Sequence, residues 1–108
     1  MTAASKLELS KMEEMLEYAK EAANLLKKMG NENRLLILCS LINGEQSVGK
    51  LNEMMPLSQS ALSQHLASLR EAGLVGKRRE AQTIYYSLRG SEAIKVIKVL
   101  QSIYCPHL

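Results

Sequence analysis

The most constraining feature of this 108-residue chain is a helical leucine pattern that is followed at once by an alternating, strand-like segment. Leu62, Leu66 and Leu69 recur at helical spacing, which places them on one side of an α-helix. Ser58 precedes the pattern and can accept a hydrogen bond from an unpaired amide of the first turn. Gly73 is a typical residue just past a helix end. The pattern therefore predicts a helix that begins at Ser58, ends before Gly73 and buries its leucines.

The opposite face of this helix carries small and amide-bearing side chains without a full charge in its first turns. Its members are Gln59, Ser60, Ser63, Gln64 and Ala67. Amides and hydroxyls both donate and accept hydrogen bonds, so they can pair with base edges in the major groove of DNA. The alternative is an ordinary solvated helix face, but such faces usually carry more Lys and Glu. We therefore predict that this face contacts bases.

A shorter helix is predicted directly upstream, over residues 47–54, with Leu51 facing inward. Pro56 then forces a turn. Two helices joined by a short turn form a helix-turn-helix, in which the second helix reads the DNA. Lys50 lies in the first turn of the shorter helix, where a cation opposes the helix dipole unless a phosphate is near. Lys50 is thus a candidate phosphate contact. The alternative interpretation, that Lys50 is a solvated surface residue without a partner, is supported equally well.

Two short strands are predicted after the longer helix, over residues 75–80 and 83–88. The first strand carries a run of three cations that ends with Arg78 and Arg79, and Gln82 lies at the hairpin tip. These residues are candidates for DNA backbone contact, although a charge run can also be a solvated strand edge. A helix-turn-helix followed by a hairpin is a winged helix-turn-helix, so the predicted fold class is mainly α, with a small β component (α+β).

Composition permits a DNA-binding function without demanding it, because the net charge of +3 and the pI of about 9.0 are modest. The length predicts a single domain over residues 1–108. No stretch approaches a membrane span, and the first ten residues lack the apolar core of a signal peptide. We therefore expect a cytoplasmic protein without a membrane partner. No nucleophile–base pair or phosphate-cradling glycine loop stands out, so an enzyme is not expected.

Two further amphipathic helices, over residues 11–29 and 91–104, carry broad apolar stripes. Between them along the chain, residues 31–42 are predicted to form a strongly apolar helix that we expect to be central in the fold. A domain of this size has too little core to cover both stripes, so a second copy of the chain is the simplest cover. We predict a homodimer through the first and last helices. The alternative interpretation is a protein-interaction module that uses these apolar stripes as its functional surface and whose helix-turn-helix does not bind DNA.

Three segments together suggest a family: NENRLLILCSL, SVGKLNEMMPLSQSALSQHLASLREAGLV and KRREAQTIYYSL. They resemble the ArsR/SmtB family of dimeric winged-helix repressors over nearly the whole chain. Cys39 and Cys105, together with SQSALSQHL and EAQTIYY, look most like the HlyU-type branch of transcriptional activators. The resemblance implies five helices with a two-stranded wing between the fourth and fifth, and dimerisation through the first and last. It also implies binding to double-stranded DNA at an AT-rich inverted-repeat promoter site, where a silencer is displaced.

The resemblance carries over to individual positions. It implies base reading by the outer face of the longer helix, a cap and phosphate contact for Ser58, and wing contacts for Arg79 and Gln82. His65 occupies the histidine of the family's S-x-HL motif and is expected to be a hydrogen-bonded flank of the core. Many members have Gly-Arg at the wing tip where this chain has Ala81 and Gln82, so an arginine inserted into the minor groove is not expected here. No cofactor is implied.

Metal sensing is not expected, because the segments in which metal-sensing members carry their ligands hold no cluster of ligands here. Cys39, Cys105 and His107 are too few for a closed zinc site within one subunit unless acidic or partner residues join them. The two cysteines are either inert core thiols or a reversible switch, since a permanent disulfide is unusual in the cytoplasm. We predict a switch in which oxidants or reactive sulfur species link the thiols and weaken DNA binding. The alternative is a constitutive or metal-responsive repressor with structural cysteines.

Overall fold

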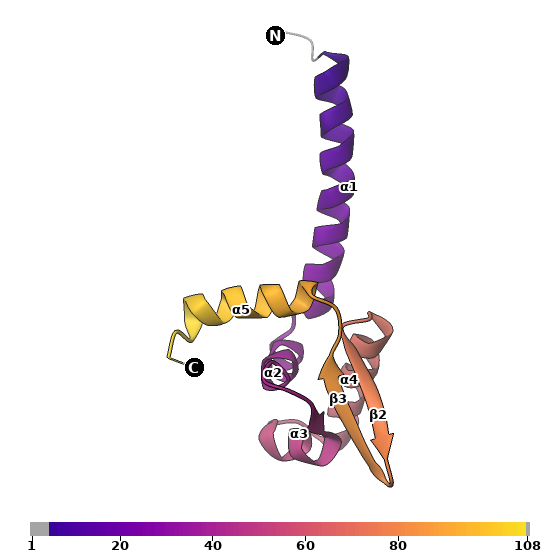
Figure 1. Cartoon of the computed structure of the whole chain (residues 1–108), viewed down its shortest axis with the longest axis vertical. Coiled ribbons are helices and arrows are strands. Elements are labelled where there is room, and N and C mark those ends of the chain that lie inside the picture. Colours follow the sequence, from indigo (N-terminus) through magenta and orange to yellow (C-terminus); the bar gives the residue numbers. More distant parts are fainter. Residues whose placement is uncertain (1–4, 108) are drawn as a thin grey trace.

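The computed structural model describes residues 5–107, and residues 1–4 and 108 lie outside the described part. Its helices are α1 (Lys6–Met29), α2 (Glu32–Ser40), α3 (Val48–Met54), α4 (Gln59–Glu71) and α5 (Glu92–Tyr104). Its strands are β1 (Gln46–Ser47), β2 (Val75–Glu80) and β3 (Thr83–Leu88). Helices α2, α3 and α4 form a body with the sheet, and α1 and α5 project from it in different directions (Figure 1). The predicted winged helix-turn-helix is confirmed.

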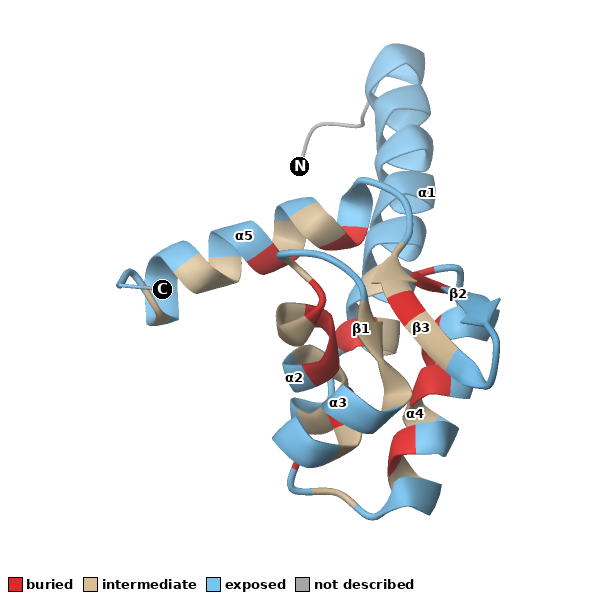
Figure 2. Cartoon of the chain, turned by 60° about the horizontal axis from the view of Figure 1, so that its bottom comes forward, coloured by how far each residue is buried: buried red, intermediate tan, exposed pale blue. Residues whose placement is uncertain are grey.

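The core lies where α2, α4 and the first half of α5 meet the sheet. Leu62, Leu66 and Leu69 are buried on the inner side of α4, as the leucine spacing predicted. Buried positions concentrate in the body, whereas α1 is exposed along most of its length (Figure 2). Within the described residues, no helix is long and apolar enough to cross a membrane.

Helix α4 has well-defined ends. The Ser58 hydroxyl accepts a hydrogen bond from the Ala61 amide at 3.1 Å, which confirms the predicted N-cap. At the other end Gly73 adopts a positive φ of 77°, its amide bonds to the Arg70 carbonyl, and the next amide, Leu74, bonds to the Leu69 carbonyl. This pair of hydrogen bonds is a Schellman motif, which satisfies carbonyls that the helix leaves unpaired. The motif turns the chain from α4 directly into the wing.

Two helix boundaries and one additional strand differ from the sequence-based expectation. Helix α1 begins at Lys6 and not near residue 11, because Ser5 and Glu8 form a capping box with two hydrogen bonds of 3.2 Å. Helix α2 ends at Ser40 and is followed by a turn, so it is shorter than residues 31–42. Strand β1 was not expected. It pairs antiparallel with β3 and makes the sheet three-stranded, in the order β1-β3-β2.

The wing tip contains a strained residue that offers a stability test. Glu80 pairs with Thr83, so Ala81 and Gln82 alone form the loop, and Ala81 has a φ of 55°. A side chain in this left-handed region costs about 1 kcal/mol relative to glycine. We expect Ala81→Gly to raise the free energy of unfolding in urea by up to about 0.5 kcal/mol, because the relieved strain is partly offset by the about 0.4–1 kcal/mol of freedom that glycine adds to the unfolded chain. Ala67→Gly, within α4, should instead lower it by about 1 kcal/mol. A loss of stability in Ala81→Gly would contradict the strain.

Candidate nucleic-acid interface

The outer face of α4 is exposed, polar and uncharged. The side chains of Gln59, Ser60, Ser63 and Gln64 all point away from the core, on the side opposite the buried leucines. In residues 5–107 these four side chains make no hydrogen bond with the rest of the chain. Their donors and acceptors are therefore free to meet a partner, and the helix that carries them is fixed to the core along its other side.

Two further predicted contacts lie at the helix starts of the helix-turn-helix. The Ser58 hydroxyl oxygen accepts from the Ala61 amide, which leaves its own hydrogen available to donate to a phosphate oxygen. Lys50 is exposed in the first turn of α3, and its amide donates to the Ser47 hydroxyl at 3.1 Å. The Lys50 ammonium has no carboxylate within ion-pair distance among the described residues. Both residues thus present a donor on the same unit as the polar face of α4.

Arg78 on the wing is already occupied by acidic partners, which the sequence analysis did not foresee. Its guanidinium contacts the Glu45 carboxylate at 2.5 Å and the Glu80 carboxylate at 2.8 Å, and it stacks 4.5 Å from the centre of the Tyr85 ring. Glu45 lies 33 positions away in the chain and is brought to the wing by the pairing of β1 with β3. Only the tertiary structure reveals this contact, and it competes with any phosphate for Arg78.

The ion pair predicts a change in DNA affinity. Glu45→Gln removes one of the two carboxylates that pair with Arg78 and lowers the repulsion of DNA, so we expect binding about two- to fivefold tighter at low salt. Fluorescence anisotropy over a salt series measures this effect. The control is the same change in an Arg78→Gln background, where the gain should shrink because the released arginine is absent. An equal gain in both backgrounds would show that Arg78 is not restrained by Glu45.

The same pair has a defined pH range. The hydrogen bond from Arg78 and its positive charge hold the pKa of Glu45 below its ordinary value. Because the pKa is lowered in the folded state, the pair is present throughout the neutral range and is lost only as the pH falls through that lowered value. Ordinary pH changes therefore leave Arg78 restrained.

The remaining wing candidates lie at the tip. Arg79 is exposed, and its Nε donates to the Ala81 carbonyl at 3.2 Å, within the turn itself. Gln82 is exposed and lines a cavity of about 450 Å³ between the wing and the start of α3. The wing tip and the helix-turn-helix therefore face a common space, which Gln82 borders from the wing side.

His65 is hydrogen-bonded to Arg34, a residue of α2 that links three helices. Its Nδ1 accepts a hydrogen bond from Arg34 Nε at 3.5 Å, and a terminal nitrogen of Arg34 donates to the Lys28 carbonyl at 3.1 Å. These contacts link α4 to α2 and to the end of α1. The predicted role of His65 as a hydrogen-bonded flank of the core is confirmed.

The two cysteines meet in an apolar cavity of about 200 Å³ between α2 and the end of α5. Cys39 and Cys105 are both half-buried free thiols, and Leu35, Leu100 and Tyr104 complete most of the wall. Burial raises the pKa of the Cys39 thiol, and the neighbouring Cys105 raises it further. The structure thus brings together two thiols that lie 66 positions apart in the sequence. Within residues 5–107, no three His, Cys, Asp or Glu side chains converge in a way that could hold a metal ion.

Comparison with known proteins identifies the family. The model described as "Bacterial regulatory protein, arsR family" matches residues 31–77, which span α2 to the first part of the wing. The transcriptional activator HlyU of Vibrio cholerae is 51% identical over 94 residues, which cover 87% of each chain. The chain belongs to the ArsR family of bacterial regulators. It is a transcriptional regulator close to HlyU, in a family whose members bind double-stranded DNA and commonly dimerise.

Two further relatives show the range within the family. The structure of HlyU from Vibrio vulnificus superposes with a TM-score of 0.84 and 54% identity, covering 88% of this chain and 99% of that one. The biofilm growth-associated repressor of Xylella fastidiosa is 41% identical over 93 residues, which cover 86% of this chain and 82% of the repressor. ArsR-type regulators similar to this chain thus include both an activator and a repressor, and these relatives are regulators rather than enzymes.

Proposed function

We propose that this ArsR-type chain is a single-domain regulator that acts as a homodimer on an AT-rich inverted repeat and is controlled by its two cysteines. The exposed, uncharged face of α4 carries the proposal for DNA reading, because its free amides and hydroxyls suit base edges. Ser58, Lys50, Arg79 and Gln82 would contact the DNA backbone or the adjacent groove, and Arg78 would join them when it leaves Glu45.

The dimer would form through α1 and α5, which carry large apolar side chains that the rest of the chain leaves exposed. On α1 and α5 these include Met12, Met15, Leu16, Leu26, Val99 and Ile103, each more than half exposed. Apolar surface on this scale is unusual for a monomer and typical of an interface. A two-fold axis would set two α4 helices about 34 Å apart, on successive turns of the major groove.

The activating mode is proposed from similarity. Identity is higher to the HlyU activator, at 51%, than to the biofilm growth-associated repressors, at 41–45%. We infer that this chain, like HlyU-type activators, displaces a silencer from its promoter. A promoter fusion in cells with and without the gene would test this, since an activator raises expression and a repressor lowers it.

The thiol switch is proposed from the shared cavity of Cys39 and Cys105. Burial raises the pKa of the Cys39 thiol and so disfavours its thiolate, which is the nucleophile, and we therefore expect the first attack on the oxidant to come from Cys105. With peroxide, the Cys105 thiolate attacks one peroxide oxygen and the O–O bond breaks, which gives a sulfenic acid and releases hydroxide. The Cys39 thiol then displaces the sulfenic oxygen as water, so that the S–O bond is replaced by the S–S bond of a disulfide. A reactive sulfur species would instead leave a bridge that contains extra sulfur atoms.

The bridge would join α5, at the proposed dimer interface, to α2, which packs on the reading helix. Such a link changes DNA affinity if it fits one dimer geometry better than another. We expect peroxide or tetrasulfide treatment to weaken binding to an inverted-repeat duplex at least about tenfold, or about 1.4 kcal/mol. Fluorescence anisotropy at one salt concentration measures this. Cys39→Ser and Cys105→Ser should abolish the response, and an unchanged response in these variants would rule out the switch.

A further inference from the structure

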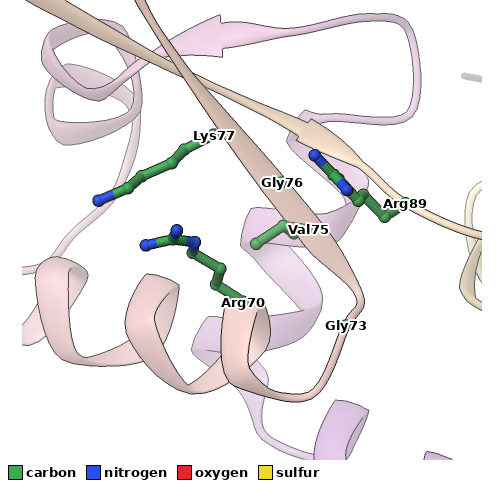
Figure 3. Close-up of a pocket in the computed structure, with 6 residues that line it drawn as sticks. All are labelled: Arg70, Gly73, Val75, Gly76, Lys77 and Arg89. Atoms are coloured by element: carbon green, nitrogen blue, oxygen red, sulfur yellow. The ribbon is translucent and has the colours of Figure 1, made fainter.

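A second cationic site lies at the base of the wing, at the far end of α4 from the proposed base-reading residues. Arg70 from the last turn of α4, Lys77 from β2 and Arg89 after β3 line one cavity of about 220 Å³, together with Gly73, Val75 and Gly76. Arg70 and Lys77 extend into the space between α4 and β2, and Arg89 approaches Gly76 from the other side of the strand (Figure 3). Three elements thus each contribute one cationic residue to the lining of this cavity, two on one side of β2 and one on the other.

These charges lack acidic partners. Within residues 5–107, no carboxylate lies within ion-pair distance of Arg70, Lys77 or Arg89, whereas Arg78 on the same strand pairs with two. Like charges held together repel each other, so an anion bound between them would be favoured. A neighbouring cavity of about 310 Å³ is lined by Arg70, Lys77 and Arg79, and extends the positive surface along β2.

The side chain of Arg89 occupies a position that depends on Gly76. The Arg89 amide donates to the Leu74 carbonyl at 2.9 Å, which fixes its backbone beside the start of β2. Gly76 is buried, and a Cβ there would collide with the Arg89 guanidinium. The absence of a side chain at this strand position therefore allows the guanidinium to lie against the backbone at the cavity wall.

We propose that this basal cleft, lined by Arg70, Lys77, Arg89 and the backbone around Gly76, binds a phosphate group. Two guanidinium groups can each donate paired hydrogen bonds to phosphate oxygens, and the lysine adds a point charge. Arg70 lies eleven residues after Gln59, about 16 Å along the helix, so the phosphate is not one beside the bases being read. It belongs either to a small phosphate-bearing molecule or to DNA that flanks the operator. A ligand here would bridge the reading helix and the wing.

The first arm of the test uses reduced full-length protein and inorganic pyrophosphate, without DNA. Calorimetry at fixed ionic strength should show saturable binding to the wild type, weakened at least about tenfold, or 1.4 kcal/mol, in Arg89→Gln. Gly76→Ala should weaken it similarly, because it displaces the guanidinium while keeping the net charge. Lys98→Gln, on α5, removes one exposed charge outside the cleft and should bind like the wild type. Arg70→Gln provides a second cleft variant if Gly76→Ala does not fold.

The second arm compares the same variants on a duplex limited to the operator and on one extended by ten base pairs at each end. If DNA supplies the phosphate, Arg89→Gln and Gly76→Ala lose affinity on the extended duplex only, and Lys98→Gln does not. Selective loss in the first arm assigns the cleft to a small molecule, and selective loss in the second assigns it to flanking DNA. If neither arm separates the cleft variants from Lys98→Gln, the proposal is overturned. Because the first arm requires no operator, its result does not depend on the proposed DNA-reading function.

Discussion

Replacing Ser63 and Gln64 together by alanine is expected to lower affinity for promoter DNA by about 100-fold or more, with the fold retained. Each good contact from such a side chain to a base edge contributes about 1–3 kcal/mol of discrimination, and a dimer loses each contact twice. Both side chains are exposed and make no hydrogen bond within residues 5–107. Alanine also favours the helix, so α4 should not be weakened. Fluorescence anisotropy on an inverted-repeat duplex at one salt concentration measures the loss.

The control for this experiment is the assembly state of the protein. Sedimentation should show the same dimer for the double variant and the wild type, and Ser10→Ala, an exposed serine on α1, should bind DNA normally. Loss of DNA binding with an intact dimer supports base recognition by the outer face of α4. Retained binding would instead favour the protein-interaction module, because the outer face of α4 would then not be needed to bind DNA.

Truncating Leu62 is expected to have the largest effect on stability. Leu62 is fully buried on the inner side of α4, where it holds the reading helix against the core. Leu62→Ala should lower the free energy of unfolding by about 2–5 kcal/mol, through lost burial and the cavity that remains. Urea unfolding at a single protein concentration measures the loss, since the stability of a dimer depends on concentration.

An exposed apolar residue supplies the comparison. Met54, at the end of α3, is 47% exposed, so Met54→Ala should cost less than about 1 kcal/mol. A similarly small loss for Leu62→Ala would mean that the core closes around the missing side chain. A large loss of stability would show that the buried leucines hold α4 against the core, which keeps its polar face turned toward solvent.

Much of the fold follows from local sequence. The spacing of Leu62, Leu66 and Leu69, the cap at Ser58 and the glycine at 73 predict both ends of α4 and its buried side. Strands β2 and β3 have the predicted bounds, because six residues suffice for an alternating pattern to appear. Strand β1 has only two residues, which is too short for such a pattern. Its existence depends on the neighbouring strand β3 and could not be predicted from the local sequence.

The sequence by itself determined the five helices, the two wing strands and which side chains on α4 face outward, because each depends on spacing along one segment. The resemblance of three segments determined the family. Only the tertiary structure decided which distant groups meet. It places Glu45 on Arg78, Cys39 beside the cavity that Cys105 lines, and Arg70 in one cleft with Arg89. These contacts join residues from separate elements, and chain packing creates them, so no local pattern of residue types could have revealed them.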